Sequence, residues 1–318
     1  MKFLRCDDGQ KWNQFIETSC QGTVFARSEC LSCYGVPQLY WVEEDGRPLL
    51  GASLLLDKSG AILSPDHTLS LYVGLYVSSS LEQLVPHKKT KKLLEVIELM
   101  MESLSTLHNH LVFVLHPSFP DLRGLQWFNY HAPEKGKFDI SLRYTGIVSL
   151  EDMDREKYLT SIRSVKRYEY KQAKDAGYKV VSTKDVALLN RIHETTFARQ
   201  GLQRTESEVA EMEKLATAAV SEGWGQIFIC ETPEGKPASA TLFLYDSTTG
   251  YYLVGANDPE YRKSGAGTFL VLENIFYCLE KGLKKIDFIG INSPNRGDYK
   301  TSLGGVPVPY FYAEWKKP

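Results

Sequence analysis

An internal repeat is the feature that most constrains what this chain can fold into. The segment Asp45–Gly60 reads DGRPLLGASLLLDKSG, and the segment Glu234–Gly250 reads EGKPASATLFLYDSTTG. Both begin with an acidic residue, Gly, a basic residue and Pro, continue with strand-forming residues, and end with Asp and a turn closed by Gly. Two hairpins can resemble each other by chance, so the repeat needs support from the elements around it. If it is genuine, the chain contains two copies of one structural unit.

The segments that flank the two hairpins also agree. LYWVEE precedes the first hairpin and QIFICET the second, and both are typical of strands. Further on, each copy has an amphipathic helical pattern followed by a strand, LVFVL in the first copy and KIDFIGI in the second. The apolar stripes of these helices are Leu93, Ile97, Met100, Leu104 and Leu107 in the first copy, and Phe269, Leu272, Phe276 and Leu279 in the second. We therefore predict an α+β chain of two tandem domains, residues 1–150 and 151–318, each with a mixed, mostly antiparallel sheet flanked by helices.

Three more helices are predicted at the start of the second domain. The first runs from about residue 155 to residue 176 and ends at Gly177, which suits a helix C-terminal cap. The second covers about residues 185–199. The third begins at the capping-box sequence TESE, residues 205–208.

The composition excludes some classes of function. The 318 residues are 43% hydrophobic with a formal net charge of -2, which indicates a soluble globular protein with no general attraction for nucleic acid. The longest apolar runs, such as LLGASLLL and LVFVL, are far shorter than the roughly 20 residues of a membrane-spanning helix. The N-terminal sequence MKFLRCDDGQ becomes acidic before a signal-peptide core could form. We expect a cytoplasmic protein with no membrane span, and its oligomeric state stays open.

The cysteines do not indicate a disulfide framework or a metal site. Six cysteines are too few for such a framework in a chain of this length, so we expect reduced thiols. Cys30 and Cys33 form one C-x-x-C pair, but no second Cys/His pair follows at zinc-ligand spacing. A metal or redox role for this pair is the minor alternative, and we predict no metal. The spacing of the residues also supports no Ser-His-Asp or Cys-His arrangement.

The segment EYRKSGAGTFLVLENIFYCLEKG, residues 260–282, has two glycines between a predicted strand and a predicted helix. Free N–H groups and the positive end of the helix dipole at such a junction favour an anion. Glycine lets the backbone approach a pyrophosphate, and arginine supplies a forked, charged donor. The predicted cofactor-binding residues are Arg262, Lys263, Gly265, Ala266 and Gly267. A plain flexible turn is the alternative. The first copy has PHKKTKKLLEV at this place, without glycine, so only the second copy is expected to bind the cofactor.

The glycine loop resembles a known family. Its spacing, Arg262-x-x-Gly265-x-Gly267, is similar to the acyl-CoA loop of the GNAT (Gcn5-related) N-acetyltransferases. A wider resemblance, to the FemAB-like acyltransferases with two GNAT domains, is carried by four blocks in the family's order: WNQFIETSCQGTVFARSECL, SVKRYEYKQAKDAGYKV, HETTFARQGLQRTESE and DFIGINSPNRGDYKTSLGG. It implies two GNAT-like domains. In this superfamily the Fem ligases transfer amino acids from aminoacyl-tRNA to peptidoglycan precursors. A second branch resembles acyl-CoA-dependent transferases of surface polysaccharide synthesis, and the glycine loop favours that branch.

Basic residues on the first predicted helix of the second half are candidate acceptor ligands. Arg163, Arg167, Lys171 and Lys174 fall on one helix face, which could grip the phosphates of a nucleotide-linked acceptor or be an ordinary solvated face. The resemblance favours Arg167, which matches the family's Arg ahead of a K-x-A-x-x-x-G ending that includes Lys171. Arg199 in TTFARQG matches another family block, although an ion-pairing surface Arg would fit equally.

The loop and strand SPDHTLSLYVGLYV of the first copy supply two further candidates. The resemblance implies that this region forms part of the acceptor channel, which would contain His67 and Tyr72. His67 has the chemistry of a general base, but a lone loop histidine is more often unspecialised.

Tyr299 and Lys300, in NRGDYKTSLGG, are the predicted catalytic residues. Residues 295–298 are predicted as a turn, after which Tyr299 and Lys300 point back into the protein. The pair resembles an aromatic-Lys pair that lies close to the reacting acyl group in the Fem ligases. An ammonium there would stabilise the oxyanion of the transition state. A surface lysine beside a turn is the alternative.

These observations together predict an N-acyltransferase. The donor would be an acyl-CoA, acetyl-CoA first of all, and the acceptor an amine of a sugar nucleotide or other cell-envelope precursor. The amine would attack the thioester directly, without a metal or a covalent acyl-enzyme. One alternative is Fem-like transfer from aminoacyl-tRNA, the only case in which nucleic acid would be a partner. Another is a non-catalytic protein that binds a ligand or a partner.

Overall fold

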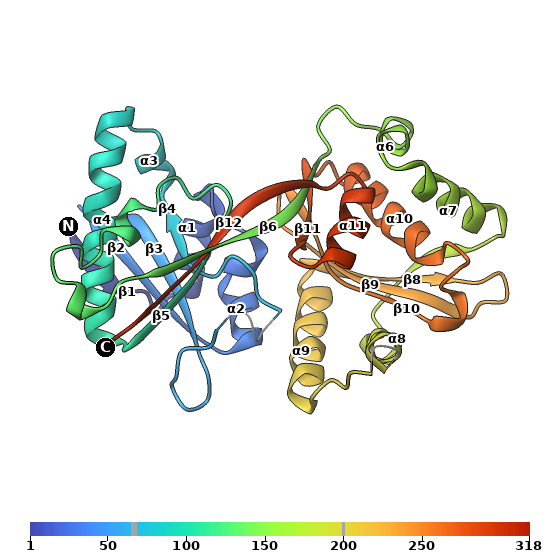
Figure 1. Cartoon of the computed structure of the whole chain (residues 1–318), viewed down its shortest axis with the longest axis horizontal. Coiled ribbons are helices and arrows are strands. Elements are labelled where there is room, and N and C mark those ends of the chain that lie inside the picture. Colours follow the sequence, from blue (N-terminus) through green and yellow to red (C-terminus); the bar gives the residue numbers. More distant parts are fainter. Residues whose placement is uncertain (65–68, 199–200) are drawn as a thin grey trace. The chain divides into compact units, whose positions relative to one another are not determined.

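The computed structural model describes residues 1–64, 69–198 and 201–318. The chain forms two compact units (Figure 1). The first unit contains residues Met1–Arg143 together with Pro309–Pro318, and the second contains Tyr144–Val308. Two strands, β6 (Asp139–Ser149) and β12 (Val306–Lys316), have residues in both units. The C-terminal segment therefore returns to the first unit.

The first unit is built on an antiparallel sheet with the strand order β1-β2-β3-β4. Its last strand in the chain, β5, pairs instead with the C-terminal part of β12. The helix α4 lies on one face of the sheet, and α1 and α2 lie on the other (Figure 1). The elements are β1 (Lys2–Arg5), α1 (Gly9–Thr18), η1 (Val24–Ala26), α2 (Ser28–Tyr34), β2 (Val36–Glu44), β3 (Arg47–Leu56), β4 (Leu75–Val77), α3 (Ser79–Glu82), α4 (Pro86–Leu107), β5 (His110–Leu115), α5 (Arg123–Gln126) and η3 (Pro133–Lys135).

Strand β3 is apolar on both faces because helices cover both. Leu50, Ala52 and Leu54 are buried in the core that also contains the apolar face of α4. Gly51 faces the other way, where a Cβ atom would lie 2.4 Å from the ring of Phe15 in α1. Side chains alternate along a strand, so this continuous apolar run serves two packed layers.

The second unit has the strand order β7-β8-β9-β10-β11-β6, in which only β10 and β11 are parallel neighbours. Helices α6, α7 and α10 cover one face of the sheet, and α8 and α9 cover the other (Figure 1). The elements are α6 (Arg155–Ser161), α7 (Ser164–Asp175), β7 (Lys179–Thr183), α8 (Val186–Ala198), α9 (Glu206–Glu222), β8 (Gly225–Glu231), β9 (Pro237–Tyr245), β10 (Thr249–Asn257), η4 (Pro259–Tyr261), α10 (Ala266–Glu280), β11 (Lys285–Gly290) and α11 (Pro294–Ser302).

The two repeated hairpins occupy equivalent positions. The hairpin β2-β3 and the hairpin β8-β9 are each the second and third strands of their sheets. Both hairpins contain the same irregularity in their pairing. Pro48 pairs with Glu43 and Pro237 pairs with Glu231, and in each case the strand with the proline has one unpaired residue before its next paired residue. The order of hairpin, strand, helix and strand that follows is also shared. The predicted fold class, an α+β chain of two tandem domains with mostly antiparallel sheets flanked by helices, is confirmed.

Two local predictions are wrong. The helix predicted over residues 155–176 is broken into α6 and α7, because Ile162 is extended and Arg163 also has a non-helical backbone conformation. Residues 295–298, predicted as a turn, lie within α11, which begins with Pro294 at a position where a missing N–H costs nothing. The cap at Gly177, with a φ of +84°, and the capping box at the start of α9 are as predicted.

Candidate active site

The parallel strands β10 and β11 separate soon after they begin. They pair only over Thr249–Tyr251 and Lys285–Asp287, although β10 continues to Asn257 and β11 to Gly290. The register of β10 against β9 shifts between Tyr252 and Val254. Beyond this irregularity the two strands each pair only with their outer neighbours, and we call this separation of the strands the strand opening. Such openings at the C-terminal ends of parallel strands are common binding sites in α/β sheets.

The end of β11 is strained. Ile289 has a φ of +49°, which a β-branched residue adopts only when its surroundings enforce it. The buried carboxylate of Asp287 supplies one restraint, because it accepts hydrogen bonds from the Ile289 N–H at 2.7 Å and from the Thr145 hydroxyl. The carbonyl oxygens of Ile289 and Gly290 supply another, because they accept from Lys300 Nζ at 3.4 and 3.0 Å. These hydrogen bonds hold both the strained backbone and the Lys300 ammonium at this end of β11.

Lys300 is a perturbed lysine. Burial is the main reason that its pKa falls from 10.5 to about 8, and the positive charge of Arg296 lowers it further. Asp287 opposes this shift, because a carboxylate favours the charged amine. The ammonium also lies 6.0 Å from the centre of the Tyr252 ring, on β10. Lys300 thus changes charge close to neutral pH while it faces the strand opening.

Tyr299 belongs to a polar network next to Lys300. Burial raises its pKa well above the ordinary value of 10.0, so the phenol stays protonated at neutral pH. The ammonium of Lys166 lies 4.9 Å from the centre of its ring and 2.8 Å from Glu169 Oε2. The same carboxylate oxygen accepts a hydrogen bond from the Thr268 hydroxyl at 2.5 Å. The network joins α7, the start of α10 and α11.

Sequence reasoning missed four members of this cluster: Tyr252, Lys166, Glu169 and Thr268. Lys166 and Glu169 fall within the block SVKRYEYKQAKDAGYKV, but only its larger basic stripe attracted attention. Their three-residue spacing was a usable signal, because it brings an acid and a base together on a helix. No local sequence pattern indicated a role for Tyr252 or Thr268, since each is typical of a core residue in its element.

The two glycines of the glycine loop are required by close contacts within the protein itself. Gly265 is the N-cap of α10 with a φ of +83°, and a Cβ atom on it would lie 2.3 Å from the Glu169 carbonyl oxygen. A Cβ atom on Gly267 would lie 2.2 Å from Asn257 Oδ1. Both glycines therefore permit close packing, and valine at either position would disturb the fold.

The start of α10 nevertheless keeps the chemistry of an anion site. The N–H groups of Gly267 and Thr268 have no acceptor among the residues that the structure describes. Ala266 differs, because its N–H group donates to the Ser264 hydroxyl at 3.2 Å. Arg262 and Lys263 are exposed at the entrance. This combination of free N–H groups, a positive helix end and two flexible cations favours a phosphate.

The predicted acceptor residues of α7 lie in different surroundings. Arg167 Nη1 donates to the carbonyl oxygens of Ile162, Thr160 and Leu159 at 2.8, 3.1 and 3.4 Å, so it ties down the C-terminal end of α6. Lys171 is exposed one turn further along α7. Arg163, formerly grouped with them, pairs with Asp298 of α11 at 2.6 Å.

The remaining predicted residues are not part of this cluster as described. Tyr72, in the first unit, is fully buried with a φ of +55°. Its ring contacts the rings of His116 and Tyr310, with centres 4.8 and 5.7 Å away. His67 and Arg199 lie outside the described residues.

The C-x-x-C pair has the environment of core cysteines. Cys30 and Cys33 are buried in α2, and burial raises the pKa of Cys30 well above its ordinary value. Such a thiol is a poor metal ligand or nucleophile, because both roles need the thiolate. Over residues 1–64, 69–198 and 201–318, no group of three or more His, Cys, Asp or Glu side chains is arranged to hold a metal ion.

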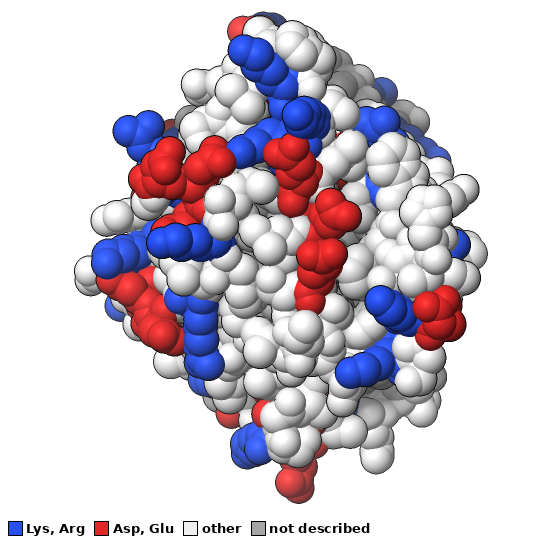
Figure 2. All heavy atoms as spheres, turned by 90° about the vertical axis from the view of Figure 1, so that its left-hand side faces the viewer, with Lys and Arg blue, Asp and Glu red and all other residues white. Residues whose placement is uncertain are grey.

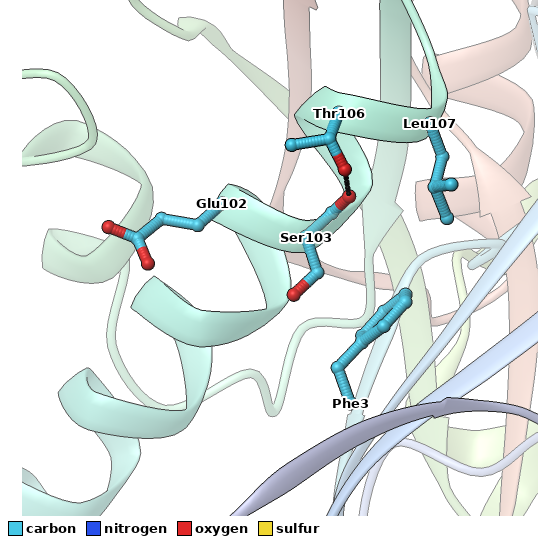
Figure 3. A pocket seen from close by; sticks show the side chains of 5 residues that line it. All are labelled: Phe3, Glu102, Ser103, Thr106 and Leu107. Atoms are coloured by element: carbon cyan, nitrogen blue, oxygen red, sulfur yellow. Dashed lines mark hydrogen bonds between the residues drawn. The ribbon is translucent and has the colours of Figure 1, made fainter.

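One shallow hollow of the first unit holds no comparable cluster of polar groups. This shallow depression is lined by Phe3 of β1 and by Glu102, Ser103, Thr106 and Leu107 of α4 (Figure 3). Thr106 donates its hydroxyl to the Ser103 carbonyl within the helix, at 2.7 Å. On the face of this unit seen in Figure 2, acidic and basic side chains are interspersed rather than gathered by sign. That distribution does not favour a polyanion such as nucleic acid.

Comparisons with known proteins agree with this architecture. A family model described as an acetyltransferase (GNAT) domain matches residues 160–301. No curated protein matches the chain in sequence. No described helix combines the length and apolar character needed to cross a membrane.

Solved structures with the same fold cover nearly the whole chain. FemX superposes with a TM-score of 0.71 at 14% identity, over 98% of this chain and 97% of its own. A tandem GNAT protein from the clavulanic acid biosynthesis pathway gives 0.56 at 15%, over 99% and 97%. L-PGS from Bacillus licheniformis gives 0.57 at 12%, over 96% and 91%. Residues 160–301 therefore match a GNAT domain, and the chain as a whole has the two-domain fold of FemX, of the tandem GNAT protein and of L-PGS.

Proposed function

We propose that the protein transfers an acyl group from an acyl-CoA, with acetyl-CoA the first candidate, to an amine acceptor. The observation that carries the proposal is Lys300, a half-buried amine with a pKa of about 8 held at the opening between β10 and β11. The exposed cations Arg262 and Lys263 beside the free N–H groups of α10 support a phosphate-bearing donor. The match of residues 160–301 to a GNAT domain supports the same class of reaction.

The chemistry follows from the two neighbours on α11. A neutral amine attacks the thioester carbonyl, and the Lys300 ammonium stabilises the negative charge that develops on the carbonyl oxygen. The carbon–sulfur bond then breaks, and the thiolate takes a proton. Tyr299 can donate a hydrogen bond to the leaving sulfur, since burial keeps its phenol protonated, while the proton itself comes from solvent. The attacking amine loses its own proton to solvent or to a group not yet assigned, and no acyl-enzyme forms.

The acceptor we propose is an amine on a sugar nucleotide or another cell-envelope precursor, reached in the cytoplasm. In this proposal the second half, residues 151–318, binds the donor, and the first half, residues 1–150, contributes to the acceptor side. Tyr72 would then support the wall of an acceptor channel from inside the core, since its side chain is buried. His67 and Arg199 remain candidate acceptor contacts.

A second donor class is favoured by one observation. FemX shares the fold over nearly the full length of both chains. An aminoacyl-tRNA donor of the Fem type is therefore the alternative, and a tight, salt-sensitive affinity for aminoacyl-tRNA would support it. A non-catalytic protein would instead bind a ligand without turning over any acyl donor.

The donor assignment is tested by calorimetry with CoA and acetyl-CoA. Arg262→Ala combined with Lys263→Ala should weaken binding about tenfold or more, because two charged phosphate contacts are lost. Lys184→Ala is the matched control, since Lys184 is an exposed lysine between β7 and α8, and it should leave the affinity unchanged. Equal CoA affinity in all three proteins would reject the glycine loop as the donor site.

A further inference from the structure

The strand opening begins between two aromatic residues. Tyr251 and Asp287 form the last pair between β10 and β11. The first residues beyond this pair are Tyr252 on β10 and Phe288 on β11. Their rings meet edge-on, with centres 6.1 Å apart and an interplanar angle of 89°. The two rings therefore lie together at the closed end of the strand opening.

The ring of Tyr252 is also held by its other neighbours. Phe243, its pairing partner on β9, has its ring centre 5.6 Å away. The phenol oxygen lies against the backbone of Gly255, where a Cβ atom would be 1.7 Å from it. Any larger residue at position 255 would displace the phenol. Close packing on these sides keeps the ring in one position.

Tyr252 is the member of this aromatic group that a ligand can reach. Phe243 and Phe288 are 1% and 0% exposed, whereas Tyr252 is only partly buried. Its hydroxyl has no hydrogen-bond partner within the described part of the chain. The Lys300 ammonium lies 6.0 Å from the ring centre. The amine that we assign to the reacting carbonyl and the ring of Tyr252 are thus found at the same opening.

The short distance between Lys300 and this ring limits the length of an acyl group. In the proposed reaction the ammonium donates to the thioester carbonyl oxygen at about 2.8 Å, which places the carbonyl carbon about 4 Å from Nζ. An aliphatic carbon lies about 3.5 to 4 Å from the ring atoms that it contacts. A chain that extends from the carbonyl carbon toward the closed end therefore meets the Tyr252 ring after about one or two carbon atoms.

We propose that Tyr252, supported by Phe288, restricts the acyl donor to short groups such as acetyl. The ring fills the closed end of the strand opening, so a longer chain has no space there unless the ring is displaced. Without the ring, the closed end would be an apolar cavity lined by Phe243 and Phe288, which favours an aliphatic chain. This inference rests on the proposed function and adds the residue that selects the donor.

The test measures binding, so it needs no acceptor. Calorimetry with the whole protein compares CoA, acetyl-CoA and octanoyl-CoA. The wild type should prefer acetyl-CoA to octanoyl-CoA. Tyr252→Ala should shift the ratio of the two affinities toward octanoyl-CoA by about tenfold or more, because each methylene group buried in the new cavity favours binding by about fourfold. Tyr252→Phe keeps the ring and should keep the wild-type ratio.

Tyr245→Ala is the matched control. Tyr245 is two residues from Phe243 on β9, so its side chain lies on the same face of the sheet. Its ring packs against Tyr277, near the end of α10 that is remote from the glycine loop, with centres 6.4 Å apart. This variant should keep the ratio of affinities within about twofold. If Tyr252→Ala does not fold, Tyr252→Leu keeps an apolar contact with the core and should extend the preference to butyryl-CoA.

Two outcomes would overturn the proposal and leave acyl transfer intact. One is an equal affinity of the wild type for acetyl-CoA and octanoyl-CoA. The other is an unchanged ratio of affinities in a folded protein that lacks the Tyr252 ring. A wild type that binds no CoA at all would instead reject the acyl-CoA donor, and this inference with it.

Discussion

Lys300 is the residue at which sequence and structure can be compared most directly. The sequence predicts that it points into the protein, and it does so from a helix rather than from behind a turn. The contacts that hold it were beyond sequence reasoning, because they depend on the positive φ of Ile289 and on carbonyl groups brought together by the end of β11. A backbone strain of this kind has no local signature.

Replacement of Lys300 by Met should lower kcat by about 100-fold or more, with CoA affinity near wild type. The physical reason is that an ammonium beside the developing oxyanion is lost, an effect worth roughly 3 to 4 kcal/mol, while the phosphate contacts lie at the start of α10. In the wild type, kcat should also fall as the pH rises through about 8, the pKa of this amine. Normal turnover by Lys300→Met with the true acceptor would assign Lys300 a structural role.

Lys300→Met should also reveal that the buried Lys300 ammonium lowers the stability of the wild-type protein. The unfolded chain keeps the Lys300 proton up to a pKa of 10.5, whereas the folded chain releases it near 8. Between these values the unfolded state binds more protons, so the unfolding free energy of the wild type rises with pH relative to that of Lys300→Met. Urea denaturation at pH 7 and pH 10 should show this relative gain, at most about 3 kcal/mol. A difference independent of pH would mean that the pKa is not lowered.

At the scale of elements, periodicity predicts long helices well and their interruptions poorly. The apolar stripe of α4 and the capping box of α9 identify these helices without help from the rest of the fold. The break between α6 and α7 is different, because tertiary contacts replace the helical bonds. Arg167 provides three of those contacts, and its donors reach carbonyl groups that a continuous helix would use itself.

Arg167→Ala should therefore act on stability. Loss of its bonds to the end of α6 should cost about 1 kcal/mol and lower Tm by a few °C, since the side chain is exposed and its bonds are partly screened. Lys171→Ala, one turn further along α7, is the control and should change Tm by less than about 1 °C. If both variants keep the wild-type Tm but weaken acceptor binding, Arg167 and Lys171 bind a phosphate of the acceptor instead.

At the scale of the whole molecule, the repeat predicts two sheets of like construction, and the structure has them. The return of the chain to its first unit was not predictable, because it concerns which sheet a C-terminal strand joins. Residues 311–316 of β12 pair with β5, and Tyr310, Ala313 and Trp315 are buried. An amphipathic strand gives no sign of a partner about 200 residues away.

Removal of residues 309–318 should destabilise the first unit far more than the second. The deletion exposes the edge of β5 and removes Ala313 and Trp315 from the core that contains the apolar face of α4. Loss of a buried tryptophan alone costs about 3 to 5 kcal/mol, a large part of the stability of a domain. Amide hydrogen exchange should therefore accelerate in α4 and β5, while α10 and β9 keep most of their protection. Deletion of Pro318 alone keeps β12 and the hydrogen bond from the Lys317 N–H to the Asn109 carbonyl, and should change neither. Equal loss of protection in both units would show that they unfold as one cooperative body.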